Sequence, residues 1–230
     1  MIPDHSPEDE SDDAELSLTI SEDFVQSPMH KQSSTTRIDF DGLLTEQPLL
    51  LLENLSKGNG GMSWPAGHVL AKYLLRSKQS MLKESSIVEL GSGGGLVGLA
   101  IAVACRPEKL VRITDQASML LLMQQNIDLN GLEGKVEASI YDWGAGNRPT
   151  DVPVPDVLLA ADCVYFEPAF PLLLQTLEEM IGPKTVCYFC FKRRRRADMH
   201  FLKAAKKAFV VEDVDDDPDR ATYARENIHL

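Results

Sequence analysis

The chain has 230 residues, 43% of them hydrophobic, which is enough apolar material for one sizeable globular domain with or without a tail. Its longest nearly continuous apolar stretch, residues 95–105, is shorter than the roughly 18 residues that a membrane-spanning helix needs, so we expect no transmembrane segment. The formal net charge of −12 disfavours general affinity for nucleic acid.

Residues 1–35 have the composition of a disordered acidic tail. They are rich in Asp, Glu, Ser, Pro and Gln and nearly free of aromatic residues, so they cannot bury enough apolar surface to offset the entropy lost on ordering. Residues 1–30 contain nine acids and no Lys or Arg, the opposite of a secretory or mitochondrial presequence, so we expect a cytoplasmic protein. The folded domain is expected to span residues 36–230 and to act as a monomer.

Two short strands, residues 36–40 and 49–55, are the first elements expected in this domain. A turn separates them and a glycine-rich loop follows as far as Trp64, so residues 36–64 are expected to form a small hairpin and loop. Pro65 then suits the first turn of a helix, because apolar residues recur after it at the spacing of a core-facing stripe, namely Val69, Leu70, Tyr73 and Leu74.

From residue 86 onward the chain alternates between apolar strands and helices. The expected strands are residues 86–90, 111–114, 136–141, 157–161 and 185–191, and the expected helices are 96–105, 118–129, 169–181 and 198–207. Strands that are apolar on both faces and separated by helices are typical of a parallel sheet covered on both sides. Residues 209–214 and 226–230 are expected to add a closing antiparallel hairpin. The sequence therefore predicts a three-layer α/β sandwich with a Rossmann-like, mostly parallel sheet.

A glycine-rich turn follows the first of these parallel strands. Five glycines lie within residues 91–98, at the junction with the next helix. Such a turn lets the backbone approach a ligand closely and places free N–H groups at a helix N-terminus, so we expect a bound ligand rather than a merely flexible turn. A dinucleotide-binding GxGxxG pattern that starts at Gly91 would need glycine where Leu96 stands, and this disfavours a pyrophosphate.

Carboxylates around the turn favour a ligand that joins an amino acid to a nucleoside. Glu89 precedes the alternating glycines Gly91, Gly93 and Gly95, and an acid there suits the cationic amino-acid end of S-adenosylmethionine (SAM). Asp115 closes the second strand, where a carboxylate can accept hydrogen bonds from both ribose hydroxyls of an adenosine ligand. Asp115 therefore indicates a nucleoside ligand but does not distinguish NAD from SAM.

Two further pairs of residues follow the third and fourth strands, at the carboxyl ends where open parallel sheets bind ligands. Asp142 could accept a hydrogen bond from an adenine amino group while the Trp143 indole covers the ring, although a buried core tryptophan is an equally good interpretation of Trp143. Asp162 and Tyr165 would lie beside the methyl donor, and the alternative for Asp162 is a cap at the start of the next helix.

The other reactive residue types show no catalytic pattern. Cys187 and Cys190 lie in one expected strand, where their sulfurs face opposite sides and cannot bridge, so we expect inert core thiols. The histidines share no metal-site spacing, and no metal is expected. A basic run, residues 192–196, has three interpretations: a solvated helix face, a nuclear-localisation signal, or a surface that docks an acidic face of a protein substrate.

With these residues in place, the chain resembles the seven-stranded class I methyltransferases and, within them, family 16, the protein-lysine methyltransferases. The resemblance covers about residues 37–230 and rests on the motifs MSWPAG, VELGSGGGLVG, ITD, YDWG and AADCVY, the last with a DxxY signature at Asp162 and Tyr165. The segments KRRRRAD and ENIHL look most like the fungal members that methylate a lysine of translation elongation factor 1-alpha. The resemblance implies a seven-stranded sheet, SAM as the cofactor and a protein substrate.

The resemblance also implies a role for each matched residue. Trp64 would pack along the methionine and sugar of SAM, Asp115 would hold the ribose, and Trp143 the adenine. Asp162 and Tyr165 would be the catalytic residues, with Asp162 docking and orienting the substrate amine rather than acting as a strong base. The other residues expected to bind the cofactor are Glu89, Gly91, Ser92, Gly93, Gly95, Asp142 and the backbone at Ala161.

The leading expectation is a SAM-dependent protein-lysine methyltransferase with no nucleic-acid or membrane partner. A methyltransferase of small molecules or nucleobases is an alternative, but the amino-methyltransferase motif with two prolines is missing, since Cys163 and Val164 follow Asp162. A SAM-binding module without turnover and an NAD oxidoreductase also remain open.

Overall fold

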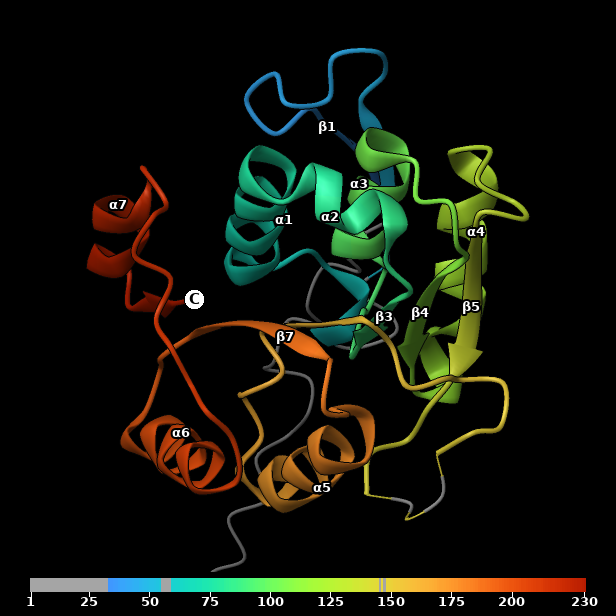
Figure 1. The fold of residues 1–230 in the computed structure, drawn as a ribbon. Helices are drawn as coiled ribbons and strands as arrows, with labels where there is room; N and C mark the ends of the chain where they lie inside the picture. The colour runs from blue at the N-terminus through green and yellow to red at the C-terminus, as the bar shows by residue number, and fades with distance from the viewer. Residues whose placement is uncertain (1–32, 55–58, 145, 147) are drawn as a thin grey trace, which may run out of the picture. The chain divides into compact units, whose positions relative to one another are not determined.

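The computed structural model describes residues 33–54, 59–144, 146 and 148–230, which form a six-stranded sheet with helices on both faces (Figure 1). Five neighbouring strands run parallel, and the strand at one edge runs antiparallel. In spatial order the strands are β5 (Val136–Ile140), β4 (Val111–Asp115), β3 (Ile87–Leu90), β6 (Val157–Ala161), β7 (Val186–Lys192) and β8 (Ile228–His229). The prediction of an α/β sandwich with a mostly parallel sheet is confirmed.

Most of the helices lie in the connections between the strands. α1 (Pro65–Ser77) begins with a proline, whose fixed φ suits a first turn, and α3 (Leu96–Cys105) is apolar all round because it packs between α1 and the sheet. The other helices are α2 (Gln79–Glu84), α4 (Leu120–Leu129), α5 (Phe170–Met180), α6 (Arg196–Ala208) and α7 (Arg220–Arg225), with 3-10 turns at η3 (Asn59–Gly61), η4 (Ala117–Met119) and η5 (Glu167–Ala169).

Alternate residues of the central strands point into two separate cores. On β3, Ile87 packs into the core that contains side chains of α1, α3 and α4, whereas Val88 and Leu90 pack into the core that contains side chains of α5 and α6. Since side chains alternate along a strand, a strand that is apolar throughout needs cover on both faces. The faces of the sheet are therefore filled, and a ligand site is left to the ends of the strands.

β1 (Ser34–Ile38) and β2 (Leu49–Glu53) form the predicted hairpin as a separate two-stranded antiparallel sheet. β1 starts slightly before the expected domain boundary at residue 36. Apart from its last residues, the acidic tail expected over residues 1–35 lies outside the described residues and stays a prediction. Residues 55–58 of the expected loop also lie outside them.

Two asparagines of the α4 segment bind the backbone of β2. Asn130 accepts the Leu50 N–H (2.9 Å) and donates to the Leu50 carbonyl (2.7 Å). Asn126 accepts the Leu52 N–H (2.7 Å) and donates to the carbonyls of Leu52 (3.1 Å) and Gly94 (2.9 Å). Each side-chain amide thus takes the place of a neighbouring strand, and Asn126 also ties the hairpin to the glycine-rich turn.

The end of the chain differs from the predicted hairpin. Residues 209–214 form no strand, and the Val214 N–H donates to the Leu230 carbonyl (3.1 Å). The described sheet has six strands rather than seven, because β8 pairs directly with β7. The acidic residues that follow residue 214 make ion pairs with α1 instead of extending a strand, as Asp217 does with Arg76 (2.8 Å).

The other predicted elements are present. Each strand expected between residues 86 and 191, and each helix expected between residues 65 and 207, forms within a few residues of its predicted bounds. The sequence pattern misses α2 and α7, because six residues are too few to show a helical repeat of apolar positions. Among the described residues, no helix combines the length and the apolar character that crossing a bilayer requires.

Replacing Asn126 by leucine tests the link between the hairpin and the turn. Asn126 is fully buried, and its loss leaves the Leu52 N–H and two carbonyls without their partner, so we expect a loss of about 2–4 kcal/mol in the free energy of unfolding. Denaturant titration measures this loss. Gln124→Ala, on the exposed side of the same helix, is the control and should change stability by less than about 0.5 kcal/mol. Equal stability of the two variants would contradict the link.

Candidate active site

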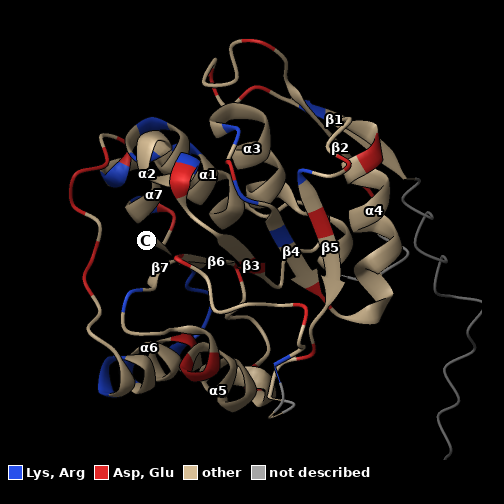
Figure 2. Ribbon diagram, turned by 45° about the vertical axis from the view of Figure 1, so that its right-hand side comes forward, with Lys and Arg blue, Asp and Glu red and all other residues tan. Residues whose placement is uncertain are grey.

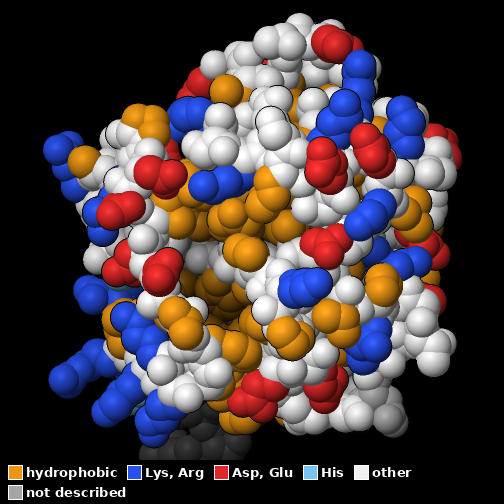
Figure 3. All heavy atoms as spheres, in the orientation of Figure 1, with side chains coloured by type: hydrophobic (Ala, Val, Ile, Leu, Met, Phe, Trp, Pro, Cys, Tyr) orange, Lys and Arg blue, Asp and Glu red, His pale blue; other side chains and the backbone are white. Residues whose placement is uncertain are grey.

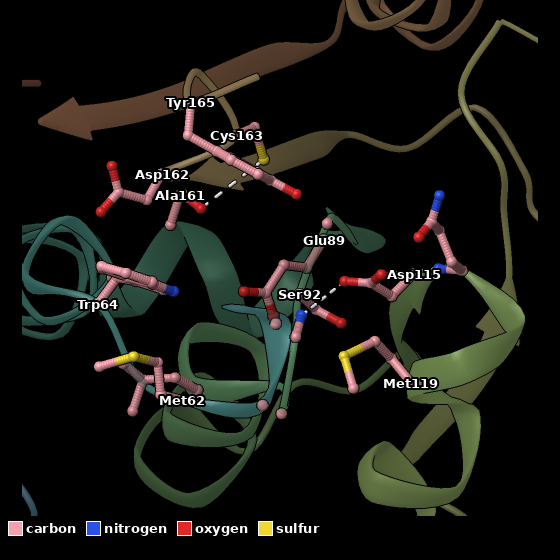
Figure 4. Close-up of a pocket in the computed structure, with 18 of the residues that line it drawn as sticks. Met62, Trp64, Glu89, Ser92, Asp115, Met119, Ala161, Asp162, Cys163 and Tyr165 are labelled. Carbon is pink, nitrogen blue, oxygen red and sulfur yellow. Dashed lines mark hydrogen bonds between the residues drawn. The ribbon is translucent and has the colours of Figure 1, made fainter. Parts of the chain in front are cut away.

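A cavity of about 750 Å³ lies at the carboxyl ends of β3, β4, β5 and β6. It brings together eleven of the twelve site residues expected from sequence, and Figure 4 shows several of them pointing toward one another. They are Trp64, Glu89, Gly91, Ser92, Gly93, Asp115, Asp142, Trp143, Ala161, Asp162 and Tyr165. Gly95 does not line the cavity. It is the residue before α3 and has a left-handed conformation (φ 88°).

Close backbone packing explains the glycines of the turn. Gly91 and Gly93 both have positive φ (58° and 56°), a conformation that other residues rarely adopt. A Cβ on Gly93 would lie 2.6 Å from the carbonyl oxygen of Gly60, and a Cβ on Gly91 would lie 2.8 Å from the Trp143 ring. At these two positions the turn therefore has room for backbone alone, and both glycines line the cavity.

Glu89 is a buried carboxyl group at the N-terminus of α3. It is 2% exposed, and its Oε2 accepts the Gly98 N–H (2.8 Å). Burial raises the pKa of Glu89 to about 8, against the opposing effect of hydrogen bonds from the first turn of the helix. A cationic group that entered the cavity would stabilise the ionised form of Glu89.

Asp115 lies across the cavity, at the end of β4. Its two carboxylate oxygens accept the N–H groups of Gly93 (2.8 Å) and Gln116 (2.7 Å). Burial, with a smaller contribution from nearby Asp142, raises the pKa of Asp115. The N–H of the turn thus holds Asp115 in place, and its remaining lone pairs are available to hydroxyl donors.

Asp162 follows β6 and is held by a bidentate ion pair. Its φ is +55°, its side chain is 3% exposed, and its two oxygens accept hydrogen bonds from Nη1 and Nη2 of Arg194, each at 2.9 Å. Tyr165 is half-exposed, and Figure 4 shows its ring reaching across the cavity toward Asp115, while the Asp162 carboxylate points to the side where Trp64 lies. The Arg194 guanidinium also lies over the Trp64 ring, 5.1 Å from its centroid. Asp162, Arg194 and Trp64 therefore form one connected unit.

Comparisons with known proteins identify the family of the chain. The family model described as lysine methyltransferase matches residues 43–208. The protein-lysine N-methyltransferase EFM6 of Saccharomyces cerevisiae is 32% identical over 85% of this chain and 89% of its own length. The protein N-lysine methyltransferase METTL21A of Danio rerio is 34% identical over 71% of this chain and 74% of its own length. The chain belongs to this family of lysine methyltransferases.

Two further similarities refine the comparison. The EEF1A lysine methyltransferase 3 of Xenopus tropicalis is 31% identical over 61% of each chain. Among solved structures, the T. thermophilus 16S rRNA N2 G1207 methyltransferase RsmC, in complex with AdoMet and guanosine, superposes with a TM-score of 0.59 over 86% of this chain and 48% of its own. At 14% identity this second likeness shows the fold alone.

As a member of this family the chain is a SAM-dependent protein-lysine methyltransferase, and its cavity fits that cofactor. SAM has a cationic amino-acid end, a sulfonium and an adenosine. The buried Glu89 and Asp115 offer carboxylates at two separate points of the cavity, and the turn at Gly93 exposes only backbone between them. These hydrogen-bond acceptors match a ligand that is positively charged at one end and carries hydroxyls at the other.

Sequence reasoning missed several residues that line the cavity. Met62 and Met119 lie on opposite sides of it in Figure 4, and Phe166 and Leu172 line it as exposed apolar side chains. Arg194 also lines the cavity, although its motif predicts only a surface run of charge. The predicted sheet could have indicated the position of Arg194, because residues that follow β7 lie beside those that follow the neighbouring parallel strand β6.

The raised pKa of Glu89 makes cofactor binding release a proton. Near pH 7 the carboxyl is mostly protonated without ligand, and the cationic end of SAM lowers its pKa, so affinity should rise with pH between about 6 and 7.5. Calorimetry in buffers with different ionisation enthalpies measures the released proton. Glu89→Gln should remove the buffer dependence and weaken SAM binding about tenfold. If both proteins released the same number of protons, Glu89 would not be the titrating group.

Proposed function

We propose that the chain methylates a lysine of translation elongation factor 1-alpha, with Asp162 and Tyr165 at the acceptor amine. The observation that carries the proposal is the position of these two residues on the wall of the cavity that also contains Glu89 and Asp115. In this arrangement the acceptor amine approaches between the exposed Tyr165 ring and the cofactor. The side chains of Phe166 and Leu172 then form the apolar surroundings of the entrance.

The cofactor-binding residues take the roles that the resemblance implies. Glu89 binds the amino group of SAM, Asp115 the ribose hydroxyls, and Trp64 packs along the methionine chain. Asp142 and Trp143 hold the adenine, and Gly91, Ser92, Gly93 and Ala161 contribute backbone or small side chains to the wall. Gly95 contributes indirectly, because its left-handed conformation turns the chain into α3.

Methyl transfer needs the lysine as a neutral amine, although the unperturbed pKa of lysine is about 10.4. Bound SAM supplies the methyl group on an electrophilic sulfonium. Apolar surroundings favour the neutral amine, because desolvation penalises the charged form. The exposed rings of Tyr165 and Phe166 give the entrance this apolar character. The protein then acts mainly by alignment and by excluding water.

Two observations support elongation factor 1-alpha as the substrate. The segments KRRRRAD and ENIHL resemble the fungal enzymes that act on this factor. One of the similar proteins, from Xenopus tropicalis, is named as an EEF1A lysine methyltransferase. A substrate of this kind agrees with the cytoplasmic location expected from sequence.

Methyl-labelled SAM and purified elongation factor 1-alpha test the substrate. The wild-type chain should label one or more lysines, which mass spectrometry locates. Asp162→Asn should lower the transfer rate at neutral pH at least tenfold while leaving SAM binding within threefold, because asparagine tolerates the positive φ and still accepts a bond from Arg194. Label on another protein of a cell lysate, with none on elongation factor 1-alpha, would contradict the proposed substrate.

A basic surface on α6 supports the docking of an acidic face of the substrate. Figure 2 marks Lys and Arg positions in blue on the ribbon of this helix, and Figure 3 shows Lys and Arg side chains gathered at the corner of the molecule where Figure 1 places it. Arg196, Lys203 and Lys207 recur at helical spacing and are exposed, and they form no ion pair with other described residues. The buried side of α6 instead consists of Asp198, Phe201 and Ala205. We call Arg196, Lys203 and Lys207 the basic stripe.

Reversing the charge of the basic stripe tests docking. The triple variant with glutamate at Arg196, Lys203 and Lys207 should raise the KM for the protein substrate about tenfold at low salt and leave kcat unchanged, and 0.5 M salt should reduce the difference. The matched control reverses three exposed lysines elsewhere, Lys83, Lys135 and Lys184, and makes the same change in net charge. Equal KM values for the two triple variants would rule out docking at the stripe.

A further inference from the structure

The Asp162 carboxylate is paired with Arg194 and accepts three hydrogen bonds. Asp162 Oδ1 accepts bonds from Arg194 Nη1 (2.9 Å) and from the Lys192 N–H (3.1 Å), and Oδ2 accepts one from Arg194 Nη2 (2.9 Å). A carboxylate has about four lone-pair positions, so Oδ2 keeps one for a further donor. The ion pair is fixed in orientation because two parallel bonds join a planar fork to a planar carboxylate.

The charge of this pair bears directly on the acceptor amine. An isolated carboxylate beside a lysine stabilises the ammonium form and raises the pKa of the amine, which opposes methyl transfer. A carboxylate paired with a guanidinium has no net charge, yet it can still accept a hydrogen bond from a neutral amine. Asp162 is 6% exposed, so solvent screens its charge weakly and the partner has to balance it.

We propose that Arg194 is a positioning residue that keeps the Asp162 site electrically neutral, so that Asp162 orients the acceptor lysine as a free amine without retaining its proton. The inference rests on the proposed place of Asp162 at the acceptor amine. In the transfer step the lysine nitrogen lone pair forms the new N–C bond while the C–S bond breaks and the sulfur keeps its electron pair. The proton of the resulting methylammonium then leaves to solvent.

The contact with Trp64 extends this role to the cofactor side of the cavity. The Arg194 guanidinium lies 5.1 Å from the centroid of the Trp64 ring, and both residues line the cavity. A planar cation over an indole adds an attraction that fixes the ring. The guanidinium therefore contacts both Asp162, which is expected to orient the acceptor amine, and the Trp64 ring, which is expected to pack along the methyl donor.

The other titratable groups near the pair do not replace Arg194. Burial raises the pKa of the Cys163 and Cys190 thiols well above their usual range and raises that of the Tyr165 phenol, so all three are neutral near pH 7. Four further acidic side chains line the cavity, namely Glu53, Glu89, Asp115 and Asp142. Lys192, Arg195 and Asp198 are the charged groups on the chain around Arg194. Asp198 is paired with Arg195 (3.3 Å) and accepts the N–H of Arg194 and Arg195 (both 2.8 Å). Among the described residues, Arg194 is the only cation whose side chain is paired with Asp162.

The pH dependence of single-turnover methyl transfer tests the proposal. In Arg194→Leu the unpaired carboxylate stabilises the ammonium form of the lysine. The rising limb of the plot of transfer rate against pH should therefore shift to higher pH by about one unit, and transfer at pH 7 should be roughly tenfold slower. In Asp162→Asn the guanidinium keeps a hydrogen bond but loses its balancing negative charge and repels the ammonium, so the limb should move to lower pH. The double variant should return the limb to its wild-type position while the maximal rate stays low. Arg194→Lys keeps the charge and should keep the wild-type limb.

Matched controls separate this role from a structural one. Arg225→Leu removes an exposed arginine of α7, outside the cavity and the basic stripe, and should leave both the limb and the maximal rate unchanged. The proposal would be overturned if the rising limb lay at the same pH in the wild type, Arg194→Leu and Asp162→Asn. It would also be overturned if the limb of the double variant lay at a different pH from that of the wild type. If Arg194→Leu did not fold, Asp162→Asn and the double variant would decide.

The pH dependence of methyl transfer can be measured whichever protein is the substrate. The rate is read on whichever protein the wild-type chain labels, whether purified elongation factor 1-alpha or another protein in a lysate of cells that lack this enzyme. Label on another protein contradicts the proposed substrate and leaves the comparison of limbs intact. Calorimetry should give a SAM dissociation constant within threefold of the wild type for Asp162→Asn, which keeps Arg194 over Trp64. Arg194→Leu also loses that contact, so its limb is read at saturating SAM, where a change in cofactor affinity alone leaves the limb in place.

Discussion

The close approach of backbone to backbone at the glycine-rich turn is the constraint on which the rest of the cavity depends. The Gly60 carbonyl oxygen lies only 2.6 Å from the place that a Cβ on Gly93 would take, so the segment that leads to Trp64 packs directly on the turn. The Gly93 N–H binds Asp115, and the Gly94 carbonyl binds Asn126 of α4. Segments far apart in the sequence therefore meet at two successive residues, Gly93 and Gly94, and a change in the turn would displace several walls of the cavity at once.

The carboxylates of the cavity explain why a cationic ligand is favoured over a phosphate. Burial is the largest cause of the raised pKa at both Glu89 and Asp115, so each is costly to ionise before a ligand binds. A helix N-terminus alone would attract an anion, but the Glu89 carboxyl occupies that position and accepts the Gly98 N–H. The fold element that binds pyrophosphate in dinucleotide enzymes thereby carries a carboxyl group at its helix N-terminus in this protein.

The sequence predicts the fold well where burial alone decides the pattern. The runs that became β3, β6 and β7 are apolar on both faces, and this marks them as central strands whatever their partners are. The strand-end residues Asp115 and Asp162 were found for a related reason, since charged residues directly after such runs lie at one edge of the sheet. Residues 209–214 were wrongly predicted as a strand because local apolar character does not reveal whether a pairing edge is already taken, here by β8.

Side-chain pairing across neighbouring strands is what the linear pattern cannot reveal. Five successive cations look like one surface feature, yet the chain is extended at Arg195 (φ −140°, ψ 167°) and helical from Arg196 onward. Arg194, before this change of backbone, pairs with Asp162, whereas Arg196 starts a helix whose periodicity carries its charge to the exposed stripe. The boundary between an extended strand end and a helix thus divides a single run of charge into an inner group, set against a buried carboxylate, and an outer group that faces solvent.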